Sequence, residues 1–93
     1  IAAEDTVFHV PEVDLGLPLT WGATARLIHE VGAARARELI LLCDRFDAGQ
    51  AAAWGAVHRA VPAAQLDATV DAWARRLAAK PEIAVHMWPC SGR

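Results

Sequence analysis

Apolar residues recur at helical spacing along much of the chain, most clearly between Ala63 and Ala79. In that stretch they fall at i, i+4, i+7, i+8 and i+11, which places on one helical face Leu66, Val70, Trp73, Ala74 and Leu77. On the opposite face, Asp71 and Arg75 have the spacing of an i,i+4 ion pair. The pattern predicts an amphipathic helix with a buried apolar face, so that Trp73→Ala costs about 3 to 5 kcal/mol.

Two further helices are predicted upstream of this one. Thr20 is placed to cap a helix that runs to about Val31 and stops at Gly32. A second helix follows from about Ala33 to Cys43, and one of its sides carries Ala36, Leu39, Ile40 and Cys43. Its last five residues are apolar all round, which favours burial on every side. We therefore expect the second helix at the centre of the core.

A capping box is indicated by Asp47 with Gln50 three residues later. It predicts a short helix from Ala48 to Trp54 that Gly55 ends. In the following stretch, Ala56 to Val61, two sets of side chains alternate along the chain, and Pro62 then ends it. This pattern is typical of a short strand or extended segment.

The two ends of the chain have weaker patterns. Ile1–Ala3 and Val7–Val10 are short β-prone pieces whose sheet neighbours are not evident from the sequence. Near the other end, Pro81 can start a helix that runs toward Met87. Residues 88–93 have no helical periodicity and read as an atypical tail. Because the chain opens without a methionine, we expect a segment upstream to be missing.

Length, composition and charge limit the class of protein. A chain of 93 residues with 55% hydrophobic and 22% charged residues can form one small folded domain. A net charge of -2 and scattered arginines do not provide the basic surface of a nucleic-acid-binding protein. No stretch is apolar over the roughly 20 residues of a membrane span, and no signal peptide is recognised. We expect a cytoplasmic protein.

Few residues are candidates for chemistry. Cys43 and Cys90 are far apart in sequence and are expected to be ordinary thiols, and the four histidines lack the spacing of a metal site. Ser91 is the only serine, and neither a nucleophile elbow nor a phosphate-binding loop is present. Carboxylates remain, of which Glu12 lies in the apolar stretch "FHVPEVDLGLPLTWG". Glu12 is either an acid at the edge of an apolar pocket, or a residue that caps the next turn or faces water.

Many residues stand in an order and spacing shared with one known family. They are Phe8, Pro11-Glu12-Val13, Leu15-Gly16-Leu17, Gly22, Thr24, Arg26-Leu27, Val31-Gly32, Ala34-Arg35-Ala36, Glu38-Leu39, Phe46-Asp47-Ala48, Gln50-Ala51, Gly55-Ala56-Val57, Val61-Pro62, Leu66, Leu77-Ala78 and Lys80-Pro81. From Ile1 to Met87 the chain resembles the second half of an enoyl-CoA hydratase/isomerase of the crotonase superfamily. The resemblance implies an α/β fold of the ClpP/crotonase kind. Residues 1–93 would be part of such a domain, mostly helical, with short strands at the start and one short extended segment, and without the upstream half of the sheet and the C-terminal helices.

The resemblance also implies a role for Glu12, which matches the glutamate that delivers a proton to the α-carbon of an enoyl thioester. An apolar setting disfavours a charged carboxylate, which suits a proton donor. In the family, a second glutamate and two backbone N–H groups that hold the thioester oxygen would precede Ile1, so we expect this chain alone to be inactive. Leu19 and Trp21 are expected to line the acyl pocket. They lie where the family commonly has a Pro-Gly-Ala-Gly-Gly run and this chain has Leu19 to Ala23, which makes the pocket wall bulkier.

The function expected from the resemblance is water addition to a 2-enoyl-CoA, or migration of its double bond, as in fatty acid β-oxidation. Coenzyme A would be part of the substrate, with no other cofactor and no metal. Family members assemble as trimers or hexamers, so a homo-oligomer or a partner chain is expected. The alternative is a non-catalytic assembly element that binds a partner chain or itself. A plain helical domain with accidental similarity is a third interpretation.

Overall fold

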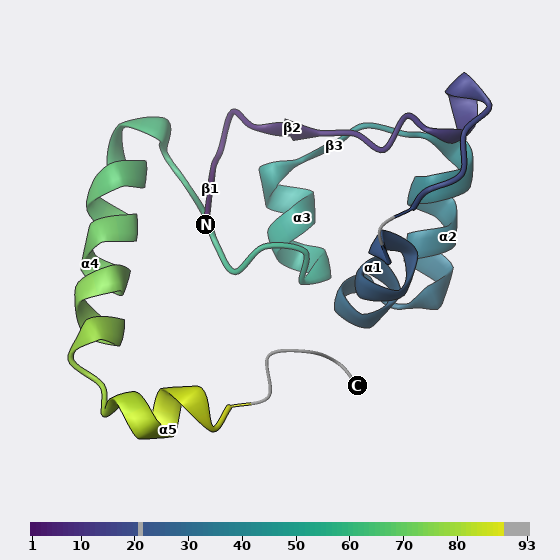
Figure 1. Cartoon of the computed structure of the whole chain (residues 1–93). Coiled ribbons are helices and arrows are strands. Elements are labelled where there is room, and N and C mark those ends of the chain that lie inside the picture. The colour runs from purple at the N-terminus through teal and green to yellow at the C-terminus, as the bar shows by residue number, and fades with distance from the viewer. Residues whose placement is uncertain (21, 89–93) are drawn as a thin grey trace.

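The computed structural model describes residues 1–20 and 22–88, and its elements form two groups along the chain (Figure 1). The first group contains the helices α1 (Ala23–Val31), α2 (Ala33–Leu42) and α3 (Ala48–Trp54). The second group contains α4 (Leu66–Ala78) and α5 (Glu82–His86), which extend away from the first. The predicted tail beyond Trp88 lies outside the described residues.

Two short strand pairs connect parts of the chain that are distant in sequence. β1 (Ala2–Ala3) pairs in parallel with β4 (Ala60–Val61), with Ala2 opposite Ala60. β2 (Val7–Phe8) pairs antiparallel with β3 (Phe46–Asp47), with Phe8 opposite Phe46. The β-prone pieces at the start of the chain are therefore strands, as predicted, whereas the predicted extended segment 56–61 narrows to its last two residues.

The predicted helix boundaries agree with the structure to within one residue for α2, α3 and α5. In the predicted stretch from Ala63 to Ala79, the first three residues form a 3-10 turn and α4 begins at Leu66. The start of α1 also differs. Gly22 occupies the N-cap of α1 at φ 70°, and no side chain caps this helix end. The prediction that Thr20 caps the helix is therefore wrong. The left-handed backbone at Gly22 begins the helix two residues later, and Thr20 contributes only its carbonyl oxygen, which accepts a bond of 3.1 Å from the Ala23 N–H.

The core lies where α2, β3 and α3 meet. Its buried centre consists of Leu39, Phe46 and Ala51, and Phe8, Trp54, Ala56 and Val57 pack against it. The Phe46 ring stacks on Phe8 with a centroid distance of 5.3 Å and meets the Trp54 ring at 5.5 Å. These three aromatic rings join β2, β3 and α3 into one packed unit.

The predicted apolar side of α2 is confirmed, because Ala36, Leu39, Ile40 and the following Cys43 are all buried. The prediction that the end of this helix is buried on every side is wrong. Leu41 and Leu42 are 56% and 63% exposed. They face away from the core of the described chain, since only one side of α2 packs against the remaining elements.

The capping box at the start of α3 is confirmed by two reciprocal hydrogen bonds. The Gln50 N–H donates to Asp47 Oδ1 at 2.7 Å, and the Asp47 N–H donates to Gln50 Oε1 at 2.9 Å. Gly55 ends the helix at φ 84°, as expected. This local motif fixes the start of α3 directly after the buried Phe46.

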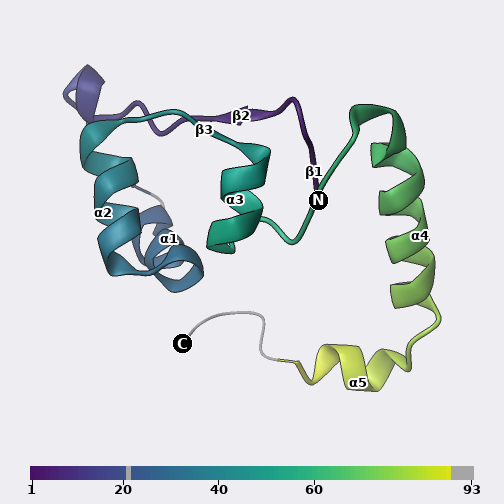
Figure 2. The ribbon, with the colours of Figure 1, turned by 180° about the vertical axis from the view of Figure 1, so that it is seen from behind.

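The apolar face of α4 is present but uncovered, which corrects the sequence-based expectation. The helix has no buried residue, Val70 is 45% exposed and Leu77 is 59% exposed. Trp73 is half-buried, with the guanidinium of Arg59 5.0 Å from its ring centroid. The view from behind shows why the apolar face of α4 is exposed: among the described elements, no other helix lies against α4 along its length (Figure 2). The predicted Asp71–Arg75 ion pair is confirmed at 2.9 Å.

No helix among the described residues is long and apolar enough to cross a membrane.

Candidate active site

Glu12 lies between β2 and a single 3-10 turn, η1 (Val13–Leu15). It occupies the N-cap of that turn with φ -55° and ψ -45°, and its side chain makes no capping hydrogen bond. A side chain at this position usually accepts a bond from the N–H of the next turn. The interpretation of Glu12 as a cap is therefore not supported by the geometry.

The carboxyl group of Glu12 is only partly solvated. The residue is half-buried, and its Oε2 atom is buried without a hydrogen-bond partner among residues 1–20 and 22–88. A buried polar atom without a partner costs about 1 to 3 kcal/mol, and more when it is charged. Such atoms are rare in folded proteins and often lie at functional sites. An isolated acid held this way can accept a partner or donate a proton.

The surroundings of Glu12 are apolar but open. In η1, Val13 is 38% and Leu15 is 68% exposed, and Leu17 after the turn is 54% exposed. One side of η1 packs against α2, beside the end of that helix that leads into β3 (Figure 1). Glu12 therefore lies at the start of a turn that packs against α2, and the apolar side chains that follow it in the sequence are exposed.

The predicted pocket residues lie on the same connection. Leu19 is half-buried and follows η1 on the segment that leads to α1. Trp21 lies outside the described residues, so its place is still a prediction. Glu12 and Leu19 thus share one connecting segment, from β2 to α1.

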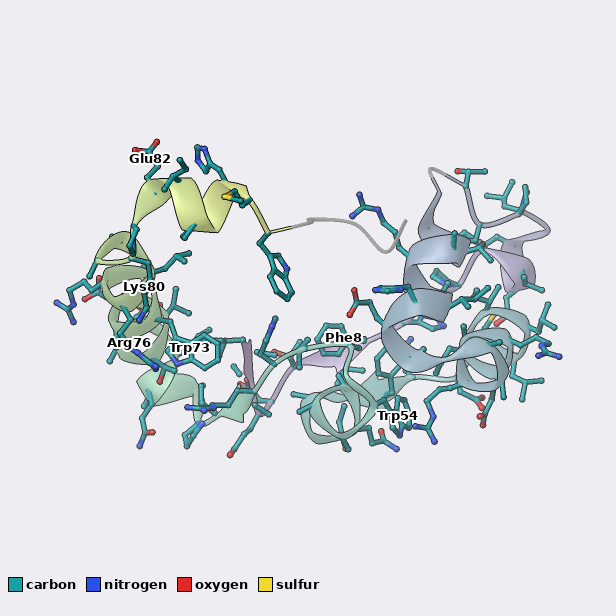
Figure 3. All side chains as sticks on the ribbon, turned by 90° about the horizontal axis from the view of Figure 1, so that it is seen from below. Phe8, Trp54, Trp73, Arg76, Lys80 and Glu82 are labelled. Atoms are coloured by element: carbon teal, nitrogen blue, oxygen red, sulfur yellow. The ribbon has the colours of Figure 1, made fainter. Side chains whose placement is uncertain are left out.

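Two shallow hollows occur elsewhere on the described surface. One, of about 390 Å³, lies against α4 and is lined by Arg59, Trp73, Arg76, Leu77 and Lys80. Figure 3 labels Trp73 and Arg76 on this helix and Lys80 just after its end. The other, of about 410 Å³, surrounds the link between α1 and α2, from Val31 to Arg35, with Glu38. Glu12 lines neither hollow. The sequence did not predict the contact between Arg59 and Trp73, because it depends on how the chain around β4 is placed against α4.

Other reactive groups do not gather into a site. His9, His29, His58 and His86 are all exposed. Cys43 is a buried free thiol, while Cys90 lies outside the described residues. Within the part of the chain that the structure describes, no group of three or more histidine, cysteine or carboxylate side chains could hold a metal ion.

Comparisons of this chain with known proteins all point to the same family. A profile described as enoyl-CoA hydratase/isomerase matches residues 1–89. A protein of Dictyostelium discoideum named "Probable enoyl-CoA hydratase, mitochondrial" is 34% identical over 87 residues, which are 94% of this chain and 31% of that protein. The chain thus spans about a third of the length of that relative.

Solved structures agree with the sequence comparison. The enoyl-CoA hydratase of Bacillus anthracis superposes with a TM-score of 0.86 at 32% identity, over 89% of this chain and 32% of that one. A Thermobifida fusca protein described as an enoyl-CoA hydratase, crystallised with acetoacetyl-CoA, superposes with a TM-score of 0.85 at 36% identity, over 88% of this chain and 32% of that one. The fold predicted from the resemblance is confirmed.

Proposed function

The chain belongs to the enoyl-CoA hydratase/isomerase family, and we propose that it contributes the general acid of an enoyl-CoA hydratase site. Glu12 is the proposed acid. The observation that carries the proposal is the Oε2 atom of Glu12, which is buried and has no hydrogen-bond partner among residues 1–20 and 22–88, at the start of a turn whose apolar side chains are exposed. The Thermobifida fusca structure holds acetoacetyl-CoA, which supports an acyl-CoA thioester as the substrate.

In the proposed reaction, water adds across the double bond of a 2-enoyl-CoA. An O–H bond of water breaks while its oxygen bonds to the β-carbon, and Glu12 gives a proton to the α-carbon. A second carboxylate takes the proton from water, and backbone N–H groups hold the thioester oxygen as it gains negative charge. Each such donor contributes about 2.7 to 4 kcal/mol to the transition state. The family resemblance matches neither this second carboxylate nor these donors to a residue among positions 1–93. The reaction consumes no other cofactor, because water and the thioester supply all its atoms.

Leu19 and Trp21 are the proposed pocket-lining residues. The half-buried position of Leu19, on the same segment as Glu12, supports its assignment. Their bulk would limit the space next to the reacting carbons.

The test is the hydration of crotonyl-CoA by the purified protein that carries this sequence, followed by the loss of thioester-conjugated absorbance. Glu12→Gln keeps the shape of the side chain and removes its acidic proton. We expect kcat to fall about 10²- to 10⁴-fold, which is the usual contribution of a general acid. Glu4→Gln is the matched control, because Glu4 is an exposed glutamate in the turn between β1 and β2, and it should leave kcat unchanged. A Glu12→Gln variant as fast as the wild type would contradict the proposal.

A second candidate function is assembly, which a separate observation favours. Large apolar side chains are exposed on several of the described helices, among them Leu41 and Leu42 on α2, Val70 and Leu77 on α4, and Ile83 and Val85 on α5. Exposed apolar surface often marks an interface. We propose that these faces bind a second copy of the chain, as in a homo-oligomer. Sedimentation of the purified protein should then give more than a monomer, and a monomer at every concentration would rule it out.

We also propose that the protein acts in the cytosol. The Dictyostelium relative is named mitochondrial, so cell fractionation with compartment markers decides between these two locations.

A further inference from the structure

Within the described part of the chain, no hydrogen bond from another side chain fixes the Oε2 atom of Glu12. Its Oε2 atom has no hydrogen-bond partner in the described part of the chain, and it makes no capping bond to η1. Metal-binding and catalytic side chains are commonly held in place by hydrogen bonds from neighbouring groups. At Glu12, we look to the backbone for what holds the carboxyl group in place.

The backbone that follows Glu12 forms a tight turn closed by hydrogen bonds. The Glu12 carbonyl oxygen accepts the N–H of Leu15 at 3.0 Å and the N–H of Leu17 at 2.8 Å. The Val13 carbonyl oxygen accepts the N–H of Gly16 at 3.0 Å. The bonds from Leu17 to Glu12 and from Gly16 to Val13 are the pair that defines a Schellman motif, which normally ends a helix. Here it closes a single turn that begins at Glu12.

The motif depends on one left-handed residue, and Gly16 fills that position at φ 73° and ψ 22°. This left-handed conformation reverses the chain, so that the Leu17 N–H reaches back to the Glu12 carbonyl oxygen. An added Cβ at Gly16 would meet no atom within 4 Å. Glycine is therefore required by the backbone angle and not by lack of space.

We propose that Gly16 is a positioning residue for Glu12. Its left-handed conformation closes the turn that presents the carboxyl group to the substrate. The proposal rests on the function proposed above, because it assigns Glu12 the role of the acid. It adds that the acid is aligned by a backbone turn, four residues long, whose geometry one glycine controls.

The experiment compares L-alanine with D-alanine at position 16. The D-residue is introduced by chemical ligation at Cys43 into the protein that carries this sequence, which is the protein used in the hydration test above. L-alanine disfavours positive φ, whereas D-alanine, its mirror image, favours it, so the two variants have the same composition and opposite backbone preference. Gly32→Ala serves as a control for strain alone, because Gly32 also has a positive φ, at 87°, an added Cβ there would meet no atom within 4 Å, and the residue lies outside the proposed pocket. Circular dichroism establishes that each variant is folded.

Two readouts are needed. One is the exchange rate of the Leu17 amide proton, measured by NMR, which reports the closed turn without any catalysis. The other is crotonyl-CoA hydration. For Gly16→Ala we expect faster Leu17 exchange and a kcat about 5- to 30-fold lower at nearly unchanged KM, as the strain of a left-handed L-residue implies. D-alanine should restore both readouts, and Gly32→Ala should leave kcat and Leu17 exchange unchanged.

Different failures are distinguishable. A Gly16→Ala variant with wild-type kcat overturns the positioning role, and so does a lowered kcat that D-alanine does not restore. If the protein that carries this sequence has a protected Leu17 amide but hydrates no crotonyl-CoA, the proposed function is overturned instead.

Discussion

Phe46→Ala should remove the centre of the core. Phe46 is 7% exposed, and its ring lies between Phe8, at a centroid distance of 5.3 Å, and Trp54, at 5.5 Å. Replacing a buried phenylalanine with alanine costs about 3 to 5 kcal/mol, from lost burial and the cavity left behind. Aromatic pairs contribute about 0.5 to 1.5 kcal/mol each beyond burial, so the upper part of that range is expected here. A domain with a total stability of about 5 to 15 kcal/mol would lose a large share of it.

The assay is urea unfolding of the purified protein, followed by circular dichroism and extrapolated to water. Val7→Ala provides the matched control, because Val7 precedes Phe8 in the same strand and is 58% exposed. Its cost should lie within about 0.5 kcal/mol of zero, as is usual at the surface. A loss below about 1 kcal/mol for Phe46→Ala would refute the assignment of the core to this aromatic cluster.

Three further outcomes are expected. Asp47→Ala should lower the free energy of unfolding by about 1 kcal/mol, because the capping bond from the Gln50 N–H is lost; an unchanged urea midpoint would contradict the capping role. Trp73→Ala should cost no more than about 1.5 kcal/mol, less than its sequence pattern predicts, because Trp73 is only half-buried; a cost above about 3 kcal/mol would show that its face is covered in solution. Replacing Leu41 and Leu42 together with lysine should shift sedimentation toward a smaller species with little loss of stability, and unchanged association would remove α2 from the interface.

Local features were predictable from the sequence. The capping box of Asp47 and Gln50 and the glycine at the end of α3 depend on neighbours three to eight residues apart, and both are present. The buried side of α2 was also predictable, since Ala36, Leu39 and Ile40 repeat at helical spacing. The prediction that Thr20 caps α1 was wrong because Gly22, with its left-handed backbone, is the N-cap of this helix.

Non-local features were not predictable in the same way. Ala2 pairs with Ala60, and no local pattern indicates which distant strand will be the neighbour. Periodicity identified the apolar face that contains Val70 and Leu77 but could not say what covers it. For Glu12, the sequence left a cap and a pocket acid open as alternatives. Only the structure shows that the capping bond is missing and that a buried oxygen of Glu12 has no partner among the residues it describes.

The most direct test of the role of Glu12 isolates the proton transfer at the α-carbon. Butyryl-CoA, a saturated thioester, is incubated in D₂O with the protein that carries this sequence, and mass spectrometry follows deuterium entering the α-carbon. A carboxyl group poised over that carbon should exchange its protons, and Glu12→Gln should slow the exchange at least about 10²-fold, as expected for loss of a general acid or base. Exchange at the wild-type rate in Glu12→Gln would contradict the assignment of Glu12 as the acid.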